Sequence, residues 1–147
     1  FDGVLMVGDG KEALSILEAL SYNEIDLSQV QCLGTGQWDN EDTWKIPSLS
    51  GAWFAAPSPE KRQAFEKAYK QNYGEVPPRL ATLGYDSLML ATVFLDQKRR
   101  PYDQTFNGID GLFSITPSGE TLRKISVMEI TAQGRAQVID DGMNKNS

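Results

Sequence analysis

The sequence predicts an α/β fold in which short parallel strands are flanked by helices and β-hairpin segments follow toward the C-terminal end. Three observations support this prediction. The chain opens with an apolar, β-rich run that leads through a glycine loop into residues with helical spacing. Two further short apolar runs follow, each separated from the previous one by a helix or a loop. From Phe106 onward, strand-like runs alternate with turn sequences.

The first strand and helix are predicted within residues 2–20. Residues 2–7 are apolar and β-rich, and they run into the loop Gly8-Asp9-Gly10. Asp9 and Glu12 have the spacing of a capping box, in which two side chains satisfy the first free backbone N–H groups of a helix. We therefore expect the helix to start close to Gly10. Its apolar residues recur with helical spacing at Ala13, Leu14, Leu17 and Leu20.

The second and third strands are predicted at residues 30–33 and 52–56. The first of these reads Val-Gln-Cys-Leu and ends in Gly34-Thr35-Gly36, and the other reads Ala-Trp-Phe-Ala-Ala. Because a helix or loop lies between successive strands, parallel pairing is favoured.

Two helices are predicted between residues 57 and 95. Ser58 can cap the first helix, Pro59 suits its first position, and Gly74 ends it. Residues 80–95 are apolar on almost every side, so we expect this second helix to be the most buried one. The amphipathic face of the first helix carries Phe65, Ala68, Tyr69 and Asn72.

The C-terminal part contains three strand-like runs, at residues 111–115, 122–130 and 136–139. Pro117-Ser118-Gly119 and Ala132-Gln133-Gly134 separate them, and such turn sequences between short strands are typical of β-hairpins.

Composition and charge narrow the possible functions. The 147 residues are 40% hydrophobic and 23% charged, which is ordinary for one globular domain. A formal net charge of −6 argues against a nucleic-acid partner, because phosphates are bound by clustered Lys and Arg. The main basic cluster, residues 98–100, is interpreted as a solvated helix end. No apolar run reaches the length of about 18 residues expected of a membrane-spanning helix.

The chain contains no histidine, which removes the usual general base and the commonest transition-metal ligand. Ser-His-Asp and Cys-His mechanisms are therefore excluded within this chain. Cys32, the single cysteine, lies in an apolar run and is predicted to be a core residue. Asp39, Glu41 and Asp42 match no calcium-loop pattern and are interpreted as a solvated acidic loop. We expect no enzymatic activity, no metal and no cofactor.

Residues 8–13, Gly-Asp-Gly-Lys-Glu-Ala, also match a relaxed dinucleotide-binding pattern, with Asp26 near the position of a ribose-binding acid. Against this alternative, Asp9 would repel a pyrophosphate, and Asp26 falls in a loop instead of at the end of a second strand. The same segment is similar to part of response-regulator receiver domains, but their acidic pair and their strand-end phosphoacceptor are not found here.

Candidate ligand-binding residues lie in two loops that follow predicted strands. Open α/β sheets bind ligands at the carboxyl ends of parallel strands, where helix N-termini present free N–H groups. Asp9 and Gly10 occupy the first such loop, and Gln37 and Trp38 occupy the second. The alternative is that Asp9 only caps its helix and that Trp38 only covers core. The sequence leaves both interpretations open.

Several segments carry a resemblance to a known family. After the first strand, loop and helix come residues 31–36, Gln-Cys-Leu-Gly-Thr-Gly, and residues 49–57, Leu-Ser-Gly-Ala-Trp-Phe-Ala-Ala-Pro. This order resembles type I periplasmic solute-binding proteins of the branched-chain amino acid and amide class. Residues 65–87 are similar to the family's F-x-x-x-Y, Y-G and A-Y-D-A sequences, and residues 108–119 to its G-x-x-G-x-x-x-F-x-x-x-G hairpin. The resemblance covers nearly the whole chain.

The resemblance implies a fold of two Rossmann-like lobes, joined by three crossovers, that close on a ligand held between them. Residues 1–56 would belong to the second lobe, residues 57–107 would supply first-lobe helices after a hinge crossing, and residues 108–147 would return through the hinge as terminal strands. Much of the first lobe would lie upstream, so the chain would carry an incomplete two-lobe fold and half a site. Tyr85 corresponds to the family's helical tyrosine, expected to pack first and to contact ligand second.

The implied function is that of a non-enzymatic solute receptor in an ABC-type uptake system. It would bind an amino acid or a similar small polar molecule in the periplasm, with a transporter permease as partner and a lipid anchor expected upstream. One departure favours an alternative. The loop of residues 34–39 lacks the Glu with which amino-acid receptors often bind the ligand's ammonium group, and it is closer to lipoproteins that activate penicillin-binding proteins. That resemblance would imply an idle cleft and a peptidoglycan synthase as partner.

Overall fold

The computed structural model describes residues 2–57, 59–95, 102 and 104–141, which divide into two compact units. Unit 1 comprises residues 1–56 and 126–147, and unit 2 comprises residues 57–125. The predicted cap Ser58 and the basic cluster at 98–100 lie outside the described residues. Residues 108–125, which the sequence analysis groups with the terminal strands, are part of unit 2.

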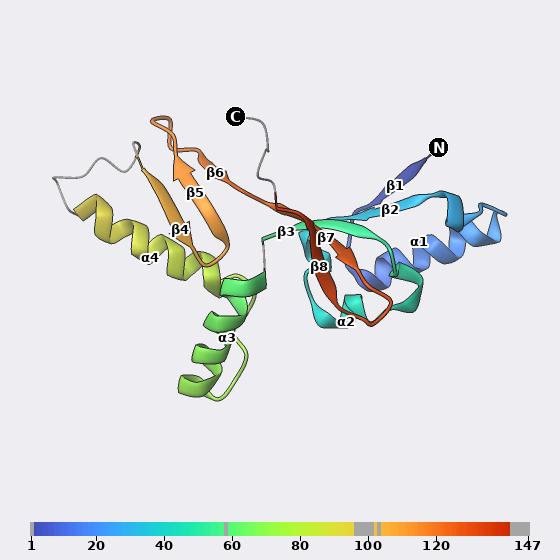
Figure 1. Ribbon diagram of the computed structural model, residues 1–147, viewed down its shortest axis with the longest axis horizontal. Helices are drawn as coiled ribbons and strands as arrows, with labels where there is room; N and C mark the ends of the chain where they lie inside the picture. Colours follow the sequence, from blue (N-terminus) through green and yellow to red (C-terminus); the bar gives the residue numbers. More distant parts are fainter. Residues whose placement is uncertain (1, 58, 96–101, 103, 142–147) are drawn as a thin grey trace. The chain divides into compact units, whose positions relative to one another are not determined.

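Unit 1 is built on a five-stranded sheet with the order β1-β2-β3-β7-β8 (Figure 1). The first three strands are parallel, as predicted, with Val4 opposite Cys32 and Leu33 opposite Trp53. Strand β7 then pairs antiparallel with β3 and with β8. The strands are β1 (Gly3–Met6), β2 (Gln31–Gly34), β3 (Trp53–Ala56), β7 (Ser126–Ile130) and β8 (Ala136–Asp140).

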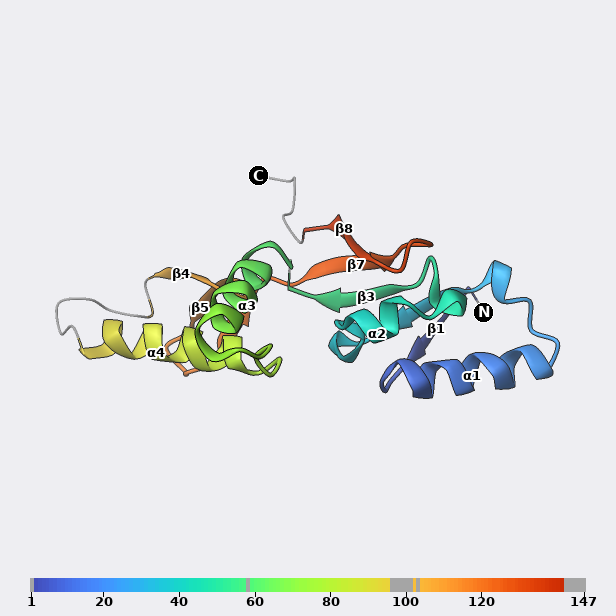
Figure 2. The same cartoon turned by 90° about the horizontal axis from the view of Figure 1, so that it is seen from below.

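Helices α1 (Gly10–Tyr22) and α2 (Glu41–Trp44) lie on the same side of this sheet (Figure 2). Helix α1 begins at the predicted residue. Cys32 is half-buried and packs against the core of unit 1, as predicted. Short 3-10 turns complete the connections at Leu27–Gln29, Gly36–Trp38 and Pro47–Leu49. The core consists of Met6, Ala13, Leu17, Trp38, Leu49, Ala52, Phe54, Ala56, Met128 and Ile130.

Unit 2 joins two helices to a three-stranded antiparallel meander (Figure 1). The predicted hairpin character of this region is confirmed. The predicted single strand over residues 122–130 is wrong, because Arg123 pairs with Phe113 in one sheet and Ser126 pairs with Ala56 in the other. The elements are α3 (Pro59–Tyr73), α4 (Ala81–Leu95), β4 (Thr105–Gly108), β5 (Gly111–Ile115) and β6 (Thr121–Arg123).

The prediction that residues 80–95 form the most buried helix is also wrong. Only Thr82 and Asp86 of α4 are fully buried, whereas the side chains of Leu88 and Leu95 are 69% and 83% exposed. The reason is that α4 packs on the meander through its few polar residues. The apolar remainder of the helix is left largely uncovered within the described part of the chain. No described helix combines the length and the apolar character needed to cross a membrane.

Candidate functional site

The candidate site in unit 1 is formed by the loops that follow β1 and β2. Because these strands are parallel neighbours, their carboxyl ends meet at the same edge of the sheet. The loop after β2 also reaches β3, since a Cβ on Gly36 would lie 3.4 Å from the carbonyl oxygen of Ala55. Both predicted loops therefore stand at one edge, which is the position expected of a ligand-binding site in an open α/β sheet.

The loop after β1 forms the predicted capping box. Asp9 Oδ1 accepts hydrogen bonds from the backbone N–H groups of Lys11 (2.8 Å) and Glu12 (3.0 Å). Glu12 Oε2 in return accepts one from the N–H of Asp9 (2.8 Å). Two carboxylates thus occupy the positive end of the helix dipole. A phosphate or a ligand carboxylate would meet negative charge here, which argues against the dinucleotide alternative.

Gly10 is buried where α1 approaches α2. A Cβ at this position would lie only 2.6 Å from Thr43 Oγ1 and 3.0 Å from Ile46 Cδ1. The absence of a side chain therefore permits close packing between α1 and the segment that contains α2. Helix packing thus explains why residue 10 is a glycine. Contact between Gly10 and a ligand stays a prediction.

The loop after β2 exposes Gln37 and buries Trp38. Thr35 Oγ1 accepts a hydrogen bond from the N–H of Gln37 (3.4 Å), and the carbonyl of Gln37 accepts one from Asn40 Nδ2 (2.8 Å). These bonds fix the backbone while the Gln37 side chain stays in solvent. Trp38 is completely buried, and its Nε1–H donates to the carbonyl oxygen of Gly8 (3.1 Å). Trp38 therefore joins the two loops from beneath, and Asp9 and Gln37 are the exposed candidates.

The fifth predicted residue, Tyr85, lies in unit 2 and is 46% exposed. Its ring packs edge-on against Phe65 at 5.6 Å between centroids. Tyr85 lines an apolar groove of about 730 Å³ between α3, α4 and the β4–β5 turn. Sequence reasoning did not predict this groove. The sequence feature that indicates the groove is the apolar character of residues 80–95 on all sides. The sequence analysis interpreted this feature as evidence of a buried helix.

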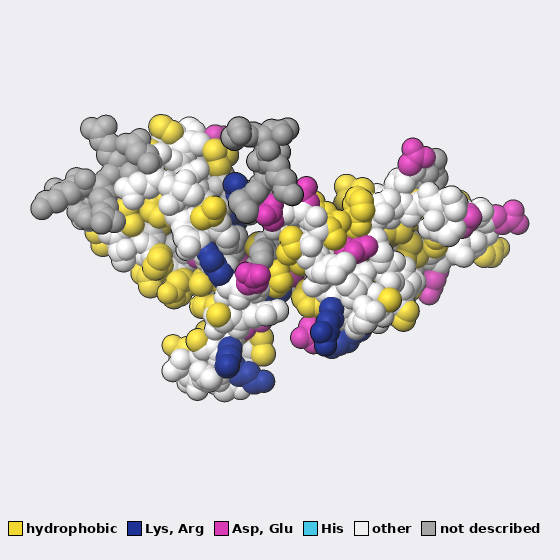
Figure 3. Space-filling view, viewed as in Figure 1, with side chains coloured by type: hydrophobic (Ala, Val, Ile, Leu, Met, Phe, Trp, Pro, Cys, Tyr) yellow, Lys and Arg dark blue, Asp and Glu magenta, His cyan; other side chains and the backbone are white. Residues whose placement is uncertain are grey.

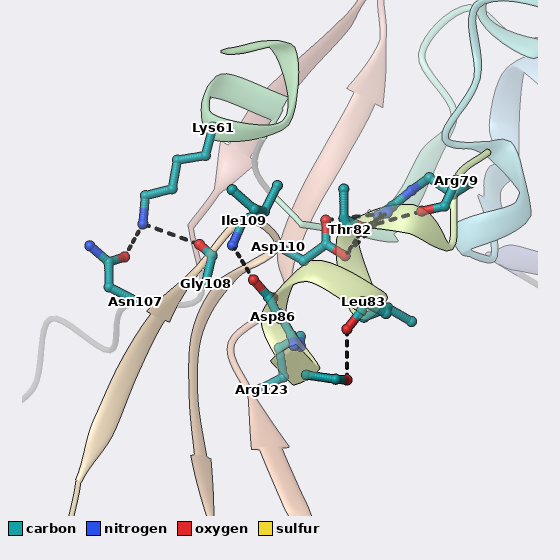
Figure 4. Close-up of polar contacts among 11 residues, drawn as sticks. Lys61, Arg79, Thr82, Leu83, Asp86, Asn107, Gly108, Ile109, Asp110 and Arg123 are labelled. Carbon is teal, nitrogen blue, oxygen red and sulfur yellow. Dashed lines mark hydrogen bonds and ion pairs between the residues drawn. The ribbon is translucent and has the colours of Figure 1, made fainter. Parts of the chain in front are cut away.

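A buried polar cluster fixes α4 to the meander beneath this groove (Figure 4). Asp86 accepts hydrogen bonds from the N–H of Ile109 (2.7 Å) and from Arg123 (3.1 Å), whose guanidinium also lies over the Phe113 ring. Asp110 accepts from Thr82 Oγ1 (2.7 Å) and, in the same cluster, from Arg79. These carboxylates are bound by protein donors, so the cluster is structural.

Few groups in the described residues are suited to catalysis. Partial burial raises the pKa of the Cys32 thiol, which keeps the thiol protonated and weakly nucleophilic. The described residues contain no group of three or more His, Cys, Asp and Glu side chains placed to hold a metal ion. Hydrogen bonds from Ser28 lower the pKa of Asp26, which caps a 3-10 turn at the surface. Asp26 is thus engaged in local structure.

Comparison with known proteins gives a fold but no sequence family. No protein-family model matches the chain, and no curated protein sequence matches it. Among solved structures, the leucine-binding protein LivK from Thermotoga maritima superposes with a TM-score of 0.64 at 19% identity, covering 93% of this chain and 43% of LivK. LivJ from Streptococcus pneumoniae, a branched-chain amino acid substrate-binding protein in complex with isoleucine, gives a TM-score of 0.61 at 23% identity, covering 95% and 45%.

A similar protein of another kind is LpoA from Haemophilus influenzae, with a TM-score of 0.61 at 16% identity, covering 94% of this chain and 26% of LpoA. The chain thus spans less than half the length of each of these three structures. LivK and LivJ are named as binding proteins for leucine and for branched-chain amino acids, and LpoA is a protein of another kind. The chain has a mixed α/β fold with a parallel sheet and flanking helices that matches the fold of type I periplasmic binding proteins over nearly all of its residues.

Proposed function

We propose that the protein is a non-enzymatic binding protein that holds a small polar ligand, such as an amino acid, against the loops after β1 and β2. The observation that carries this proposal is the hydrogen bond from Trp38 Nε1 to the Gly8 carbonyl (3.1 Å). It ties the two loops together and holds exposed Asp9 and Gln37 at one edge of the sheet. Loops that are ordered in advance lose less conformational entropy when a ligand binds.

The chemistry of this edge indicates which end of the ligand it would contact. The Asp9 carboxylate accepts hydrogen bonds, and the Gln37 amide both donates and accepts them. Because Asp9 and Glu12 already occupy the start of α1, a ligand ammonium or hydroxyl group would be favoured there and a carboxylate disfavoured. Unit 1 would then supply one wall of the binding site.

The fold supports a place for this activity in an ABC-type uptake system. Two of the similar structures are named as leucine-binding and branched-chain amino acid substrate-binding proteins. On this proposal the protein works in the periplasm, delivers its ligand to a transporter permease and performs no chemistry on it.

Thermal unfolding in the presence of each standard amino acid tests the proposal. We expect at least one of them to raise the unfolding midpoint, and Asp9→Asn to weaken that ligand at least tenfold. Asn is as good an N-cap as Asp, so this variant removes charge while the helix start is retained. Ser15→Ala, on the exposed face of α1, is the control and should bind normally. A panel in which no amino acid shifts the midpoint would contradict the proposal.

A second function is favoured by the N-terminus of α1, whose backbone N–H groups are already bound by the Asp9 carboxylate. Because the protein's own carboxylates take the position at which many α/β folds bind an anionic group, the edge is also suited to remain empty. The loop of residues 34–39 has no Glu, and the fold matches LpoA as well as it matches LivJ. The alternative is a lipoprotein that activates a penicillin-binding protein. Binding of a purified peptidoglycan synthase, together with no response to amino acids, would favour it.

A further inference from the structure

Asn40 lies between the loop after β2 and the start of α2, and its side chain bonds to both. Its Nδ2 donates to the carbonyl oxygen of Gln37 (2.8 Å), and its Oδ1 accepts from the backbone N–H of Thr43 (2.9 Å). Its own backbone N–H donates to the carbonyl oxygen of Trp38 (2.8 Å). One residue is thus hydrogen-bonded to two residues of the candidate site and to the helix that follows them.

Helix α2 depends on contacts of this kind. It has only four residues, and such a short helix is not stable through its own backbone hydrogen bonds. Charged side chains of both signs lie around it in the space-filling view (Figure 3). The ion pair between Glu41 and Lys45 (2.9 Å) is exposed, and exposed pairs contribute little. The N-cap bond from Thr43 to Asn40 is therefore important for the position of α2.

Thr43 extends these contacts to the other loop of the candidate site. Thr43 is buried, and a Cβ on Gly10 would lie 2.6 Å from its Oγ1. Gly10 comes two residues after Gly8, whose carbonyl accepts the N–H of the Trp38 ring. The contacts therefore form a closed path through Gly8, Trp38, Asn40, Thr43 and Gly10. Because both loops belong to this path, a displacement of Asn40 would disturb each of them.

We propose that Asn40 is a positioning residue that holds Gln37 in place for ligand binding. This inference rests on the proposed function, since it assigns a role in the same site. Asn40 acts through the backbone that carries the exposed Gln37 amide, and it does not bind the ligand itself. The alternative is that Asn40 only caps α2. Its two side-chain atoms separate these roles, because Oδ1 caps the helix and Nδ2 holds the loop.

Asn40→Asp tests the proposal, because aspartate caps a helix as well as asparagine does but has no hydrogen to donate. Thermal unfolding should give a midpoint close to that of the wild type. Calorimetric titration uses the standard amino acid that stabilises the wild type most. Its affinity should fall about fivefold, the factor that corresponds to one lost hydrogen bond. Asn40→Ser, which caps without adding a charge, should lose affinity in the same way.

Asn23→Asp is the matched control. Asn23 is also exposed, and its Nδ2 donates to the carbonyl oxygen of Ala19 (2.8 Å) at the C-terminal end of α1. Aspartate there places a negative charge at the negative end of the helix dipole, so this variant should be less stable than the wild type. Its affinity for the amino acid should be unchanged. The two variants are thus expected to show opposite patterns, one losing affinity and the other losing stability.

The order of the loop is measurable without any added amino acid. Amide heteronuclear NOE values at residues 36–38 should fall in Asn40→Asp and stay unchanged in Asn23→Asp. Wild-type order of this segment in Asn40→Asp, or wild-type affinity, would overturn the inference and leave the proposed function standing. A wild type that responds to no amino acid would contradict the proposed function, and the inference would fall with it.

Discussion

Trp38 and Gly8 are joined by a hydrogen bond of 3.1 Å, from the indole Nε1–H to the backbone carbonyl, across the loops that follow two neighbouring strands. The indole is completely buried and lies against Gly34, where any Cβ would collide with the ring. One side chain thus fills the core of unit 1 and sets the spacing of the loops that carry Asp9 and Gln37.

Replacing Trp38 by Phe should destabilise the protein by about 1–3 kcal/mol, because it leaves the Gly8 carbonyl unpaired and opens a cavity. Trp53→Phe is the control. Trp53 is 38% exposed on β3, so its replacement should cost about 1 kcal/mol or less. Urea unfolding followed by circular dichroism measures both. Equal losses in the two variants would show that the indole of Trp38 has no special role.

Two glycines of unit 2 should respond to alanine in opposite directions. A Cβ on Gly108 would collide with the Asp86 carboxylate, whereas one on Gly84 would have no described atom within 4 Å. Gly108→Ala should therefore destabilise by about 1–3 kcal/mol through overpacking. Gly84→Ala should stabilise by about 0.5–1 kcal/mol, because alanine is favoured inside helices. Thermal unfolding of the two variants in dilute solution checks the signs, and a shared sign would contradict the packing described here.

Loss of the Asp86 carboxylate should be costly because it leaves Arg123 without its partner. Asp86 and Arg123 are 3% and 17% exposed, and their atoms are 3.1 Å apart. We expect Asp86→Ala to destabilise by about 3–5 kcal/mol. The comparison is Glu41→Ala, which breaks the exposed pair with Lys45 and should leave stability almost unchanged, because solvent screens that pair. Chemical denaturation of both variants gives the difference, and similar values would refute the buried-pair account.

The thiol of Cys32 should react slowly in the folded protein. Burial raises its pKa, so the folded chain holds its proton to a higher pH than the unfolded chain does. The stability that this contributes is fully present below the unfolded pKa, near 8.5, and is lost as the pH rises from there through the higher folded pKa. Labelling with Ellman's reagent at pH 8 should therefore be several-fold slower in buffer than in urea. Equal rates in the two solutions would mean that the thiol is freely exposed.

Local sequence patterns predicted the parallel half of the fold well. The Asp9–Glu12 capping box and the start of α1 depend on residues three apart, so short-range chemistry determines them. The same is true of the turns that separate the C-terminal strands. The division of residues 122–130 between two sheets could not be predicted, since it depends on partners distant in the sequence, Phe113 and Ala56.

The candidate site was predicted in position but not in the role of each side chain. Asp9 and Gln37 are exposed at the expected edge, whereas Trp38 lies beneath it. A tryptophan beside a glycine-rich loop is equally suited to a ligand contact or to a core position. Trp38 is a core residue because Gly34 leaves space for its ring and the Gly8 carbonyl accepts its N–H. The apolar character of α4 predicted that other protein surfaces cover the helix on all sides. The sequence alone did not show whether the described part of this chain supplies those surfaces.

The measurement that tests the central claim most directly is an amide NMR titration of the isotopically labelled protein with the standard amino acids. The account predicts that the amino acid that stabilises the protein shifts the backbone signals of residues 8–10 and 35–37, and that Asp9→Asn weakens these shifts. No shift with any amino acid, or shifts confined to the groove of unit 2, would contradict it.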